Sequence, residues 1–280
     1  MKKIAIIIIA AVLAIAIAIG IIIGVFYSKE NSDNERALGL WWWDNRLDSS
    51  YLDFACEKGI NEIYYYTSSF SEKNSNFIKE ANRKGIEVLW LAGKYEWIED
   101  SSDLVLKIDE FLEFQKMSPY KFKGIHFDIE PHQHPLFEEK RSELLKKFIN
   151  LTYVLRTDYP NLWIEYDIPL WFDDVILFDG TAKPVYEHII DNASKITIMS
   201  YRDSSEEIYK AAEDEIDYAL SVGKTLNLGV ETGENDDDIV TFYEEGEVYM
   251  YNELSKLKEK LPQNFGIAIH HIKSWYNMKD

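Results

Sequence analysis

Short apolar runs alternate with longer amphipathic segments from residue 37 to the C-terminal end of the chain. The short runs are rich in β-branched and aromatic residues and are bounded by turn residues, which predicts strands. The longer segments repeat apolar positions at helical spacing. The expected strands are residues 37–43, 60–67, 86–93, 122–130, 162–169, 195–201, 225–231 and 265–271. The expected helices lie near residues 48–58, 73–84, 101–118, 135–158, 182–193, 204–222 and 248–261.

Eight strands separated by seven helices fit the (β/α)8 barrel, an α/β fold that typically needs about 250 residues. The alternative is a doubly wound sheet, but no glycine-rich phosphate loop follows the first expected strand. Residues 274–280 leave room for only a stub of an eighth helix. We therefore expect one barrel domain over residues 37–280.

The N-terminal segment follows a different pattern. Residues 4–26 carry no charge, and as a helix they would span roughly 35 Å, enough to cross a bilayer core of about 30 Å. A cleaved signal peptide has an apolar region of only about 7–15 residues that ends in a small-residue cleavage site, whereas this run ends in Val25-Phe26-Tyr27. The sequence predicts an uncleaved, single-pass transmembrane helix.

The charges around this helix predict its orientation. Lys2 and Lys3 precede it, so the positive-inside rule places residues 1–3 in the cytosol. Residues 27–36 form a polar tether, and the barrel follows it outside the cell. We expect a protein of the cell membrane with an extracellular domain.

Composition narrows the choice of partners. The net charge is −19, and without the two lysines before the apolar run the outer part carries −21. Such a field repels nucleic acid and anionic headgroups. A content of 14% aromatic residues, with eight tryptophans, is typical of a folded domain rather than a disordered one. The single Cys56 excludes a disulfide within the chain.

Polar residues gather on the row of each expected strand that faces the barrel interior. Strand residues alternate between interior and helix layer, and the apolar row is expected to face the helices. The expected inward row is Trp41, Trp43, His126, Asp128, Glu130, Trp163, Glu165, Asp167, Thr197, Met199, Tyr201, Asn227, Gly229, Glu231, Gly266, Ala268 and His270. Burying carboxylates side by side costs several kcal/mol unless they are paired or used. We therefore expect a functional site at the C-terminal mouth, where barrel enzymes have their active sites.

The sharpest segment of this row is Asp128-Ile129-Glu130. Two carboxylates at positions i and i+2 of one strand repel each other, which raises the pKa of one of them as a general acid at neutral pH requires. Aromatic side chains such as Trp43 and Trp163 would exclude water and stack on sugar rings. This combination of residue types suits glycoside hydrolysis.

Two segments resemble strand motifs of the family-18 glycoside hydrolases, the chitinase-like enzymes. Gly124-Ile125-x-x-Asp128-x-Glu130 resembles the fourth-strand signature of that family, and Met199-Ser200-Tyr201 resembles its sixth-strand Met-x-Tyr. The resemblance implies a barrel in which Glu130 is the general acid, Asp128 orients the acetamido group of the substrate and Tyr201 holds the acetamido oxygen. It also implies that this N-acetyl group is the nucleophile, and that Trp275 stacks on a sugar.

Three single positions and one strand motif depart from the family pattern. Lys123 and His126 stand where the family has aspartates, and Arg202 stands where an aspartate is expected after the strand-six tyrosine. On strand three, Leu91-Ala92-Gly93-Lys94 replaces Ser-x-Gly-Gly. These departures leave a catalytically inactive carbohydrate-binding barrel as an alternative.

A retaining glycosidase that uses Glu130 and Glu231 is a further alternative. Glu130-Pro131 closes the fourth strand and Glu231 the seventh, which resembles the placement of acid/base and nucleophile in retaining barrel glycosidases. Carboxyl groups about 5–5.5 Å apart would suit a covalent intermediate.

The sequence thus predicts a membrane-anchored, outward-facing glycoside hydrolase-like barrel that acts on a glycan or cell-wall polysaccharide. The candidate catalytic residues are Asp128, Glu130, Tyr201 and Glu231. The candidate substrate-binding residues are Trp41, Trp43, Asp167, Met199, Asp203, His270 and Trp275. We expect no cofactor and no metal: with Asp128 the histidines at 132, 134, 270 and 271 offer nitrogen and oxygen ligands, but their spacing is a weak signal, and histidines near a cleft usually form hydrogen bonds.

Overall fold

The computed structural model describes residues 36–46 and 48–279. The predicted transmembrane helix at residues 4–26 lies outside these ranges. Within them, no helix is both long enough and apolar enough to cross a membrane. Residues 37–280 form one compact unit.

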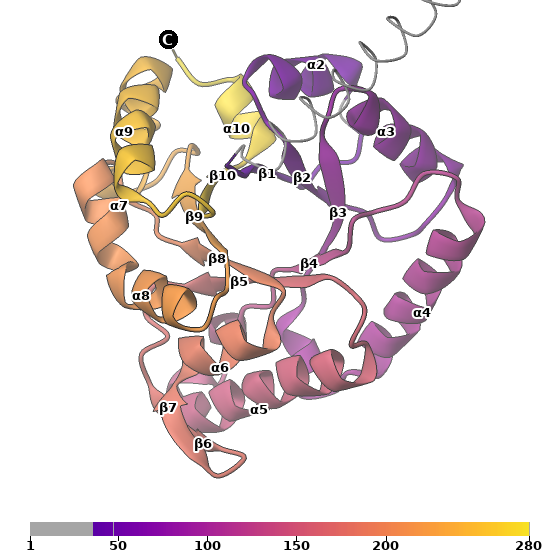
Figure 1. Ribbon diagram of the computed structural model, residues 1–280, viewed down its shortest axis with the longest axis vertical. Coiled ribbons are helices and arrows are strands. Elements are labelled where there is room, and N and C mark those ends of the chain that lie inside the picture. Colours follow the sequence, from indigo (N-terminus) through magenta and orange to yellow (C-terminus); the bar gives the residue numbers. More distant parts are fainter. Residues whose placement is uncertain (1–35, 47, 280) are drawn as a thin grey trace, which may run out of the picture. The chain divides into compact units, whose positions relative to one another are not determined.

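Eight parallel strands close into a barrel, as the sequence predicted, and the helices form a ring around it (Figure 1). Around the barrel the strand order is β1-β10-β9-β8-β5-β4-β3-β2. The strands are β1 (Leu38–Trp42), β2 (Glu62–Tyr66), β3 (Glu87–Ala92), β4 (Ile125–Phe127), β5 (Ile164–Pro169), β8 (Lys195–Met199), β9 (Leu226–Glu231) and β10 (Gly266–His270).

The helices of the outer layer follow the strands in alternation. They are α2 (Ser49–Glu57), α3 (Glu72–Arg83), α4 (Ser102–Met117), α5 (Phe137–Asp158), α6 (Val185–Asn192), α7 (Ser205–Ala211), α8 (Glu213–Ser221), α9 (Glu247–Lys260) and α10 (Ile272–Tyr276). Short 3-10 turns η1 (Tyr95–Ile98), η2 (Pro131–Gln133) and η3 (Asp238–Val240) follow β3, β4 and β9. The five-residue α10 is the stub of an eighth helix that was expected.

Two elements differ from the expected ones. The helix expected near residues 182–193 starts only at Val185, because residues 181–184 form strand β7, which pairs antiparallel with β6 (Val175–Phe178). The turn between them is Asp179-Gly180 with φ angles of 46° and 77°, the backbone that a tight hairpin needs. The helix expected near residues 204–222 is broken at Ala212, whose φ of −124° is not helical.

The main apolar core lies between the sheet and the helices, and it contains the outward row of the strands. Leu40, Ile63, Val88 and Ile198 are almost fully buried there. Inside the barrel, the apolar cluster is smaller and consists of Trp41, Tyr64, Leu89, Leu91 and Ala268, with Trp43 packed against it. The rest of the interior is polar, so the predicted alternation holds.

Candidate active site at the barrel mouth

A cavity of about 390 Å³ opens at the C-terminal ends of the strands. Six residues of the predicted site line it, and they come from the ends of four strands. The lining residues are Trp43, Gly93, Lys94, Tyr95, Asp128, Glu130, Gln133, Met199, Tyr201 and His270. The structure therefore brings together Trp43, Asp128, Glu130, Met199, Tyr201 and His270, which lie as far apart as 227 positions in the chain.

Asp128 lies just after β4 and has a buried carboxyl oxygen. Its backbone N–H donates to the Ala92 carbonyl at 3.0 Å, and a Cβ at Gly93 would lie only 1.7 Å from the Asp128 carbonyl oxygen, so this close approach requires glycine. Oδ1 of Asp128 is buried and accepts no hydrogen bond from any described residue. Burial, with the charges of Asp167 and Glu130, raises the pKa of Asp128 well above its ordinary value.

Glu130 lies two residues further on, at the start of η2, with its side chain 20% exposed. The Gln133 amide donates to its Oε2, and His132 Nε2 lies 3.4 Å from its Oε1. Burial and the charge of Asp167 raise the pKa of Glu130. The cavity thus holds two neighbouring carboxyl groups that both retain protons to higher pH than usual, as a general acid requires.

On another wall of the cavity, His270 links Trp43 to Glu231. The Trp43 indole N–H donates to His270 Nε2 at 3.2 Å, and His270 Nδ1 lies 2.6 Å from Oε2 of Glu231. Since Nε2 accepts, the proton of the neutral imidazole is on Nδ1. The Tyr201 ring lies 5.9 Å from the His270 ring, and burial with the charge of Glu231 raises the pKa of Tyr201 well above its ordinary value.

Glu231 is engaged on both oxygens. Its Oε1 accepts the backbone N–H groups of Thr232 and Gly233 at 2.7 and 2.6 Å, while Oε2 accepts from His270. Burial acts to raise the pKa of Glu231, but these hydrogen bonds, that of His270 first, outweigh it and lower the pKa. Glu231 is not among the cavity-lining residues, and it holds His270 in place.

Asp167 and Trp41 also lie outside the cavity lining. Both are 1% exposed, and the Trp41 indole donates to Oδ2 of Asp167 at 2.9 Å. Oδ1 of Asp167 lies 2.8 Å from Nε2 of His126, whose Nδ1 lies 3.0 Å from Oε2 of Glu165. Burial alone would lower the pKa of His126, but these two carboxylates raise it to about 9, so His126 is an imidazolium at neutral pH.

A buried ion network fills the interior towards the N-terminal ends of the strands. Lys195 pairs with Glu62 and, at 3.2 Å, with Glu165, and Lys123 pairs with Glu62 at 3.1 Å. Burial acts to raise the pKa of Glu62, but the two lysines lower it to about 2. Trp163 also lies at this end, where it donates to Glu165 at 2.6 Å, so the expectation that it walls the mouth is wrong.

Two further predicted residues lie away from the cavity. Trp275 is on α10 in the helix layer, 2% exposed, where it packs on Phe54 and donates to Oε1 of Glu247 at 2.7 Å. This burial contradicts the stacking role that the resemblance implied. Asp203 follows β8 and donates its backbone N–H to Ile239 at 3.0 Å, but it does not line the cavity.

Four cavity residues were missed because they lie beyond the ends of the strands. Gly93, Lys94 and Tyr95 follow β3, and Gln133 follows β4. Residues outside strands have no alternation that assigns them to a face. Their position at or directly after the end of an expected strand is the feature of the sequence that could have placed them at the mouth.

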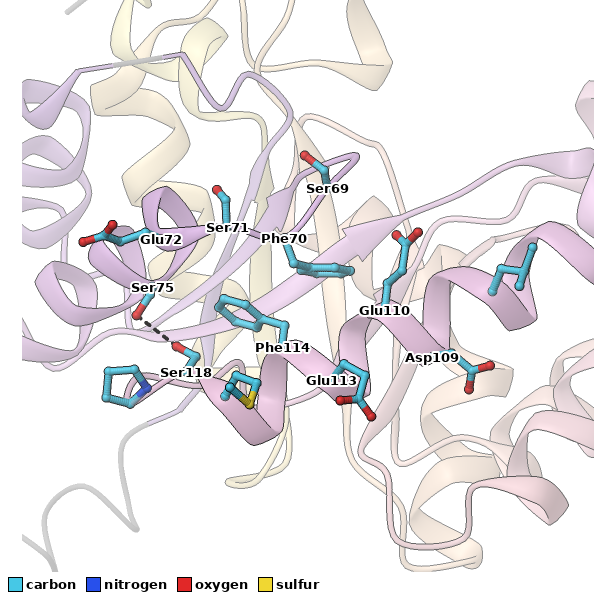
Figure 2. A pocket seen from close by; sticks show the side chains of 13 residues that line it. Ser69, Phe70, Ser71, Glu72, Ser75, Asp109, Glu110, Glu113, Phe114 and Ser118 are labelled. Carbon is cyan, nitrogen blue, oxygen red and sulfur yellow. Dashed lines mark hydrogen bonds between the residues drawn. The ribbon is translucent and has the colours of Figure 1, made fainter.

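A second hollow, of about 1000 Å³, lies between the loop after β2 and helix α4 (Figure 2). Phe70, Phe114 and Met117 give it an apolar lining. Two of its carboxylates, Glu110 and Glu113, pair with lysines of the same helix at 2.8 and 2.6 Å. None of its described lining residues belongs to the predicted site, so the barrel mouth remains the candidate active site.

Comparison with solved structures identifies the architecture. The ICChI chitinase from Ipomoea carnea superposes with a TM-score of 0.50 at 11% identity, over 85% of this chain and 96% of that one. The chain shares its fold with a chitinase. The spore cortex-lytic enzyme SleL from Bacillus megaterium gives a TM-score of 0.50 at 13% identity, over 87% of this chain and 74% of SleL.

A GH18 chitinase from Cycas revoluta gives a TM-score of 0.48 at 14% identity, over 85% of this chain and 96% of that one. No family model matches the sequence, and neither does any curated protein. The likeness to the ICChI chitinase confirms the predicted resemblance to chitinase-like glycoside hydrolases for the fold. At 11% identity, the likeness is one of fold alone.

Proposed function

We propose that this protein is a glycoside hydrolase that cleaves an N-acetylated glycan, with Glu130 as the general acid. The observation that carries the proposal is the Asp128–Glu130 pair, two adjacent carboxyl groups with raised pKa values in an aromatic-walled cavity. A carboxyl group that stays protonated near neutral pH can give its proton to a leaving oxygen.

The residues of the cavity suggest a division of roles. Glu130 protonates the glycosidic oxygen as the bond from that oxygen to the anomeric carbon breaks, while the acetamido oxygen of the substrate attacks the same carbon. Asp128, whose buried Oδ1 accepts no hydrogen bond from the described part of the chain, orients the acetamido group, and the Tyr201 hydroxyl holds the carbonyl oxygen of this group. Water, activated by the Glu130 carboxylate, then attacks the anomeric carbon as the bond from this carbon to the acetamido oxygen breaks, and the proton from water goes to Glu130. Trp43 offers a ring for stacking on a sugar.

The covalent alternative with Glu231 as nucleophile has less support. A nucleophilic carboxylate needs a free oxygen directed at the anomeric carbon. Both oxygens of Glu231 accept hydrogen bonds within the protein, from Thr232, Gly233 and His270. We therefore favour the substrate-assisted scheme and assign Glu231 the role of holding His270.

Turnover of N-acetylated oligosaccharides by the purified protein tests the proposal. Glu130→Gln should reduce kcat about 10²–10⁴-fold while sugar binding and unfolding temperature stay close to wild type. Asp128→Asn should be almost as damaging, and glycans without N-acetyl groups should not be cleaved.

The Glu231→Gln variant separates the schemes, because azide should rescue its activity only if Glu231 is a nucleophile. A protein that binds glycans but cleaves none in a broad panel, and is indifferent to Glu130→Gln, would instead be a carbohydrate-binding barrel.

We also propose that residues 4–26 anchor the protein in the cell membrane, with the barrel outside the cell and facing a cell-wall polysaccharide. The support is the uncharged length of this run and the two lysines before it. Protease added to intact cells should degrade the barrel domain. Full protection in intact cells, with digestion only after lysis, would reverse the orientation.

A further inference from the structure

Asp167 is a third carboxylate beside the proposed acid pair. Phe127, the last residue of β4, pairs with Tyr166 of β5, so the residues that follow them in the chain, Asp128 and Asp167, come at the same level. Neighbouring strands lie about 4.8 Å apart, and both residues belong to the inward row. The site therefore contains three carboxyl groups, of which Asp167 alone does not line the cavity.

Asp167 is held by two donors from the barrel interior. The Trp41 indole N–H donates to Oδ2 at 2.9 Å, and Oδ1 lies 2.8 Å from Nε2 of the His126 imidazolium. The far side of His126 is fixed by Glu165 at 3.0 Å, and the ring is stacked on Tyr64 with centroids 3.6 Å apart. With His126 fully buried and Asp167 1% exposed, solvent does not screen this charge from its neighbours.

We propose that Asp167 is a positioning residue of the proposed acid site, a fixed negative charge that keeps the Asp128–Glu130 pair protonated. This inference rests on the proposed function. Burial is the largest cause of the raised pKa values of both Asp128 and Glu130, and the charge of Asp167 is the next cause for each. Asp167 itself would not touch substrate.

Other ionisable groups surround the three carboxyl groups. The neighbours on the strands, on η2 and in the cavity lining are Tyr64, Lys94, Tyr95, His126, His132, Glu165, Tyr201, Glu231 and His270. Of these, His126 acts against Asp167, because its positive charge favours the ionised form of Asp128. Glu165 binds the same imidazole as Asp167 but is not a source of either raised pKa, which makes it a matched control.

The test compares the pH profiles of kcat/KM for the full-length wild type, Asp167→Asn and Glu165→Gln. If activity needs a protonated Glu130, kcat/KM falls at alkaline pH, where the Asp128–Glu130 pair loses its proton, and this fall is the alkaline limb of the profile. Asp167→Asn should move this alkaline limb to lower pH, whereas Glu165→Gln should leave it in place. A variant that acted only by loosening the fold would lower activity at every pH. Asp167→Ala removes the same charge, should move the limb in the same direction and serves if Asp167→Asn does not fold.

A second measurement distinguishes failure of this inference from failure of the proposed function. Carboxyl ¹³C resonances of Asp128 and Glu130, assigned with Asp128→Asn and Glu130→Gln, report the titration of the pair without any turnover. In Asp167→Asn the pair should titrate at lower pH than in wild type. If the pair titrates unchanged, or moves equally in Glu165→Gln, the inference is overturned even in an active enzyme. If it moves as expected but no glycan is cleaved, Asp167 sets the protonation and the hydrolase proposal fails.

Discussion

The barrel interior contains two groups of carboxylates with opposite properties. Towards the N-terminal ends of the strands, Glu62 lies between Lys195 and Lys123, and its pKa falls to about 2 although it is only 3% exposed. At the mouth, Asp128 and Glu130 have carboxylate neighbours and their pKa values rise. Burial is common to both groups, so the charge of the partners decides the protonation state.

The same contrast exists within the mouth. Glu231 ends β9 and Glu130 follows β4, but Glu231 accepts three hydrogen bonds from protein donors and its pKa is lowered. Glu130 has Gln133 and His132 beside it, and its pKa is raised. A buried carboxylate with a full set of donors is typical of a structural role, whereas one held among like charges is a candidate for chemistry.

The largest effect on stability should come from breaking the buried ion network at the N-terminal ends of the strands. Lys195→Met removes the cation that lies between Glu62 and Glu165, which leaves two buried carboxylates without it. We expect the free energy of unfolding to fall by about 3–5 kcal/mol, measured by urea denaturation. Lys94→Met is the matched control, because its pair with Asp103 is half exposed and should contribute only about 0–1 kcal/mol. Equal losses in the two variants would show that the network does not stabilise the barrel.

The fold followed from the sequence because a barrel repeats one local pattern. Each strand is a short apolar run with period two, and each helix is long enough to show its own period, so all eight strands were predicted. The β6–β7 hairpin was missed because its strands are four residues each and half exposed, too short for a period, although Asp179-Gly180 is a strong turn signal. The break at Ala212 has no glycine or proline to mark it.

The site was predictable only in part. The alternation along a strand indicates whether a side chain faces the barrel interior, but not which other side chain it contacts. Asp128 and Glu130 were predicted from their inward positions, and both line the cavity. The pairing of Lys195 with Glu62 joins residues 133 positions apart and depends on strand register, which the sequence does not specify. Likewise, Trp275 follows the eighth strand, but the turn into α10 directs it into the helix layer.

The pH dependence of stability should reveal the charge of His126, which lies between Glu165 in the buried ion network and Asp167 near the mouth. The pKa of His126 is raised from 6.5 to about 9, so its contribution is fully present below pH 6.5 and is lost as the pH rises through about 9. The loss should be on the order of 3 kcal/mol. Glu215, whose pKa is raised to about 7, has most of its own effect below pH 7. Urea unfolding between pH 7 and pH 9 measures the loss.

His126→Gln is the control for that measurement, because an amide has no proton to lose in this range. Its free energy of unfolding should change less than that of wild type between pH 7 and pH 9. If wild type and His126→Gln keep a constant difference across this window, His126 is not an imidazolium in the folded protein.

The smallest effect should have opposite signs at the two carboxylates of the mouth. Asp128→Asn removes a carboxyl group whose raised pKa means that folding opposes its ionisation, so at pH 7 the variant should be more stable than wild type, by about 0.5–2 kcal/mol. Glu231→Gln replaces a carboxylate that three donors stabilise, so it should be less stable than wild type. Thermal unfolding of both variants measures the difference. A loss of stability in Asp128→Asn would show that Asp128 is a structural group like Glu62, whereas a gain together with lost turnover is the trade-off that a functional carboxyl group should show.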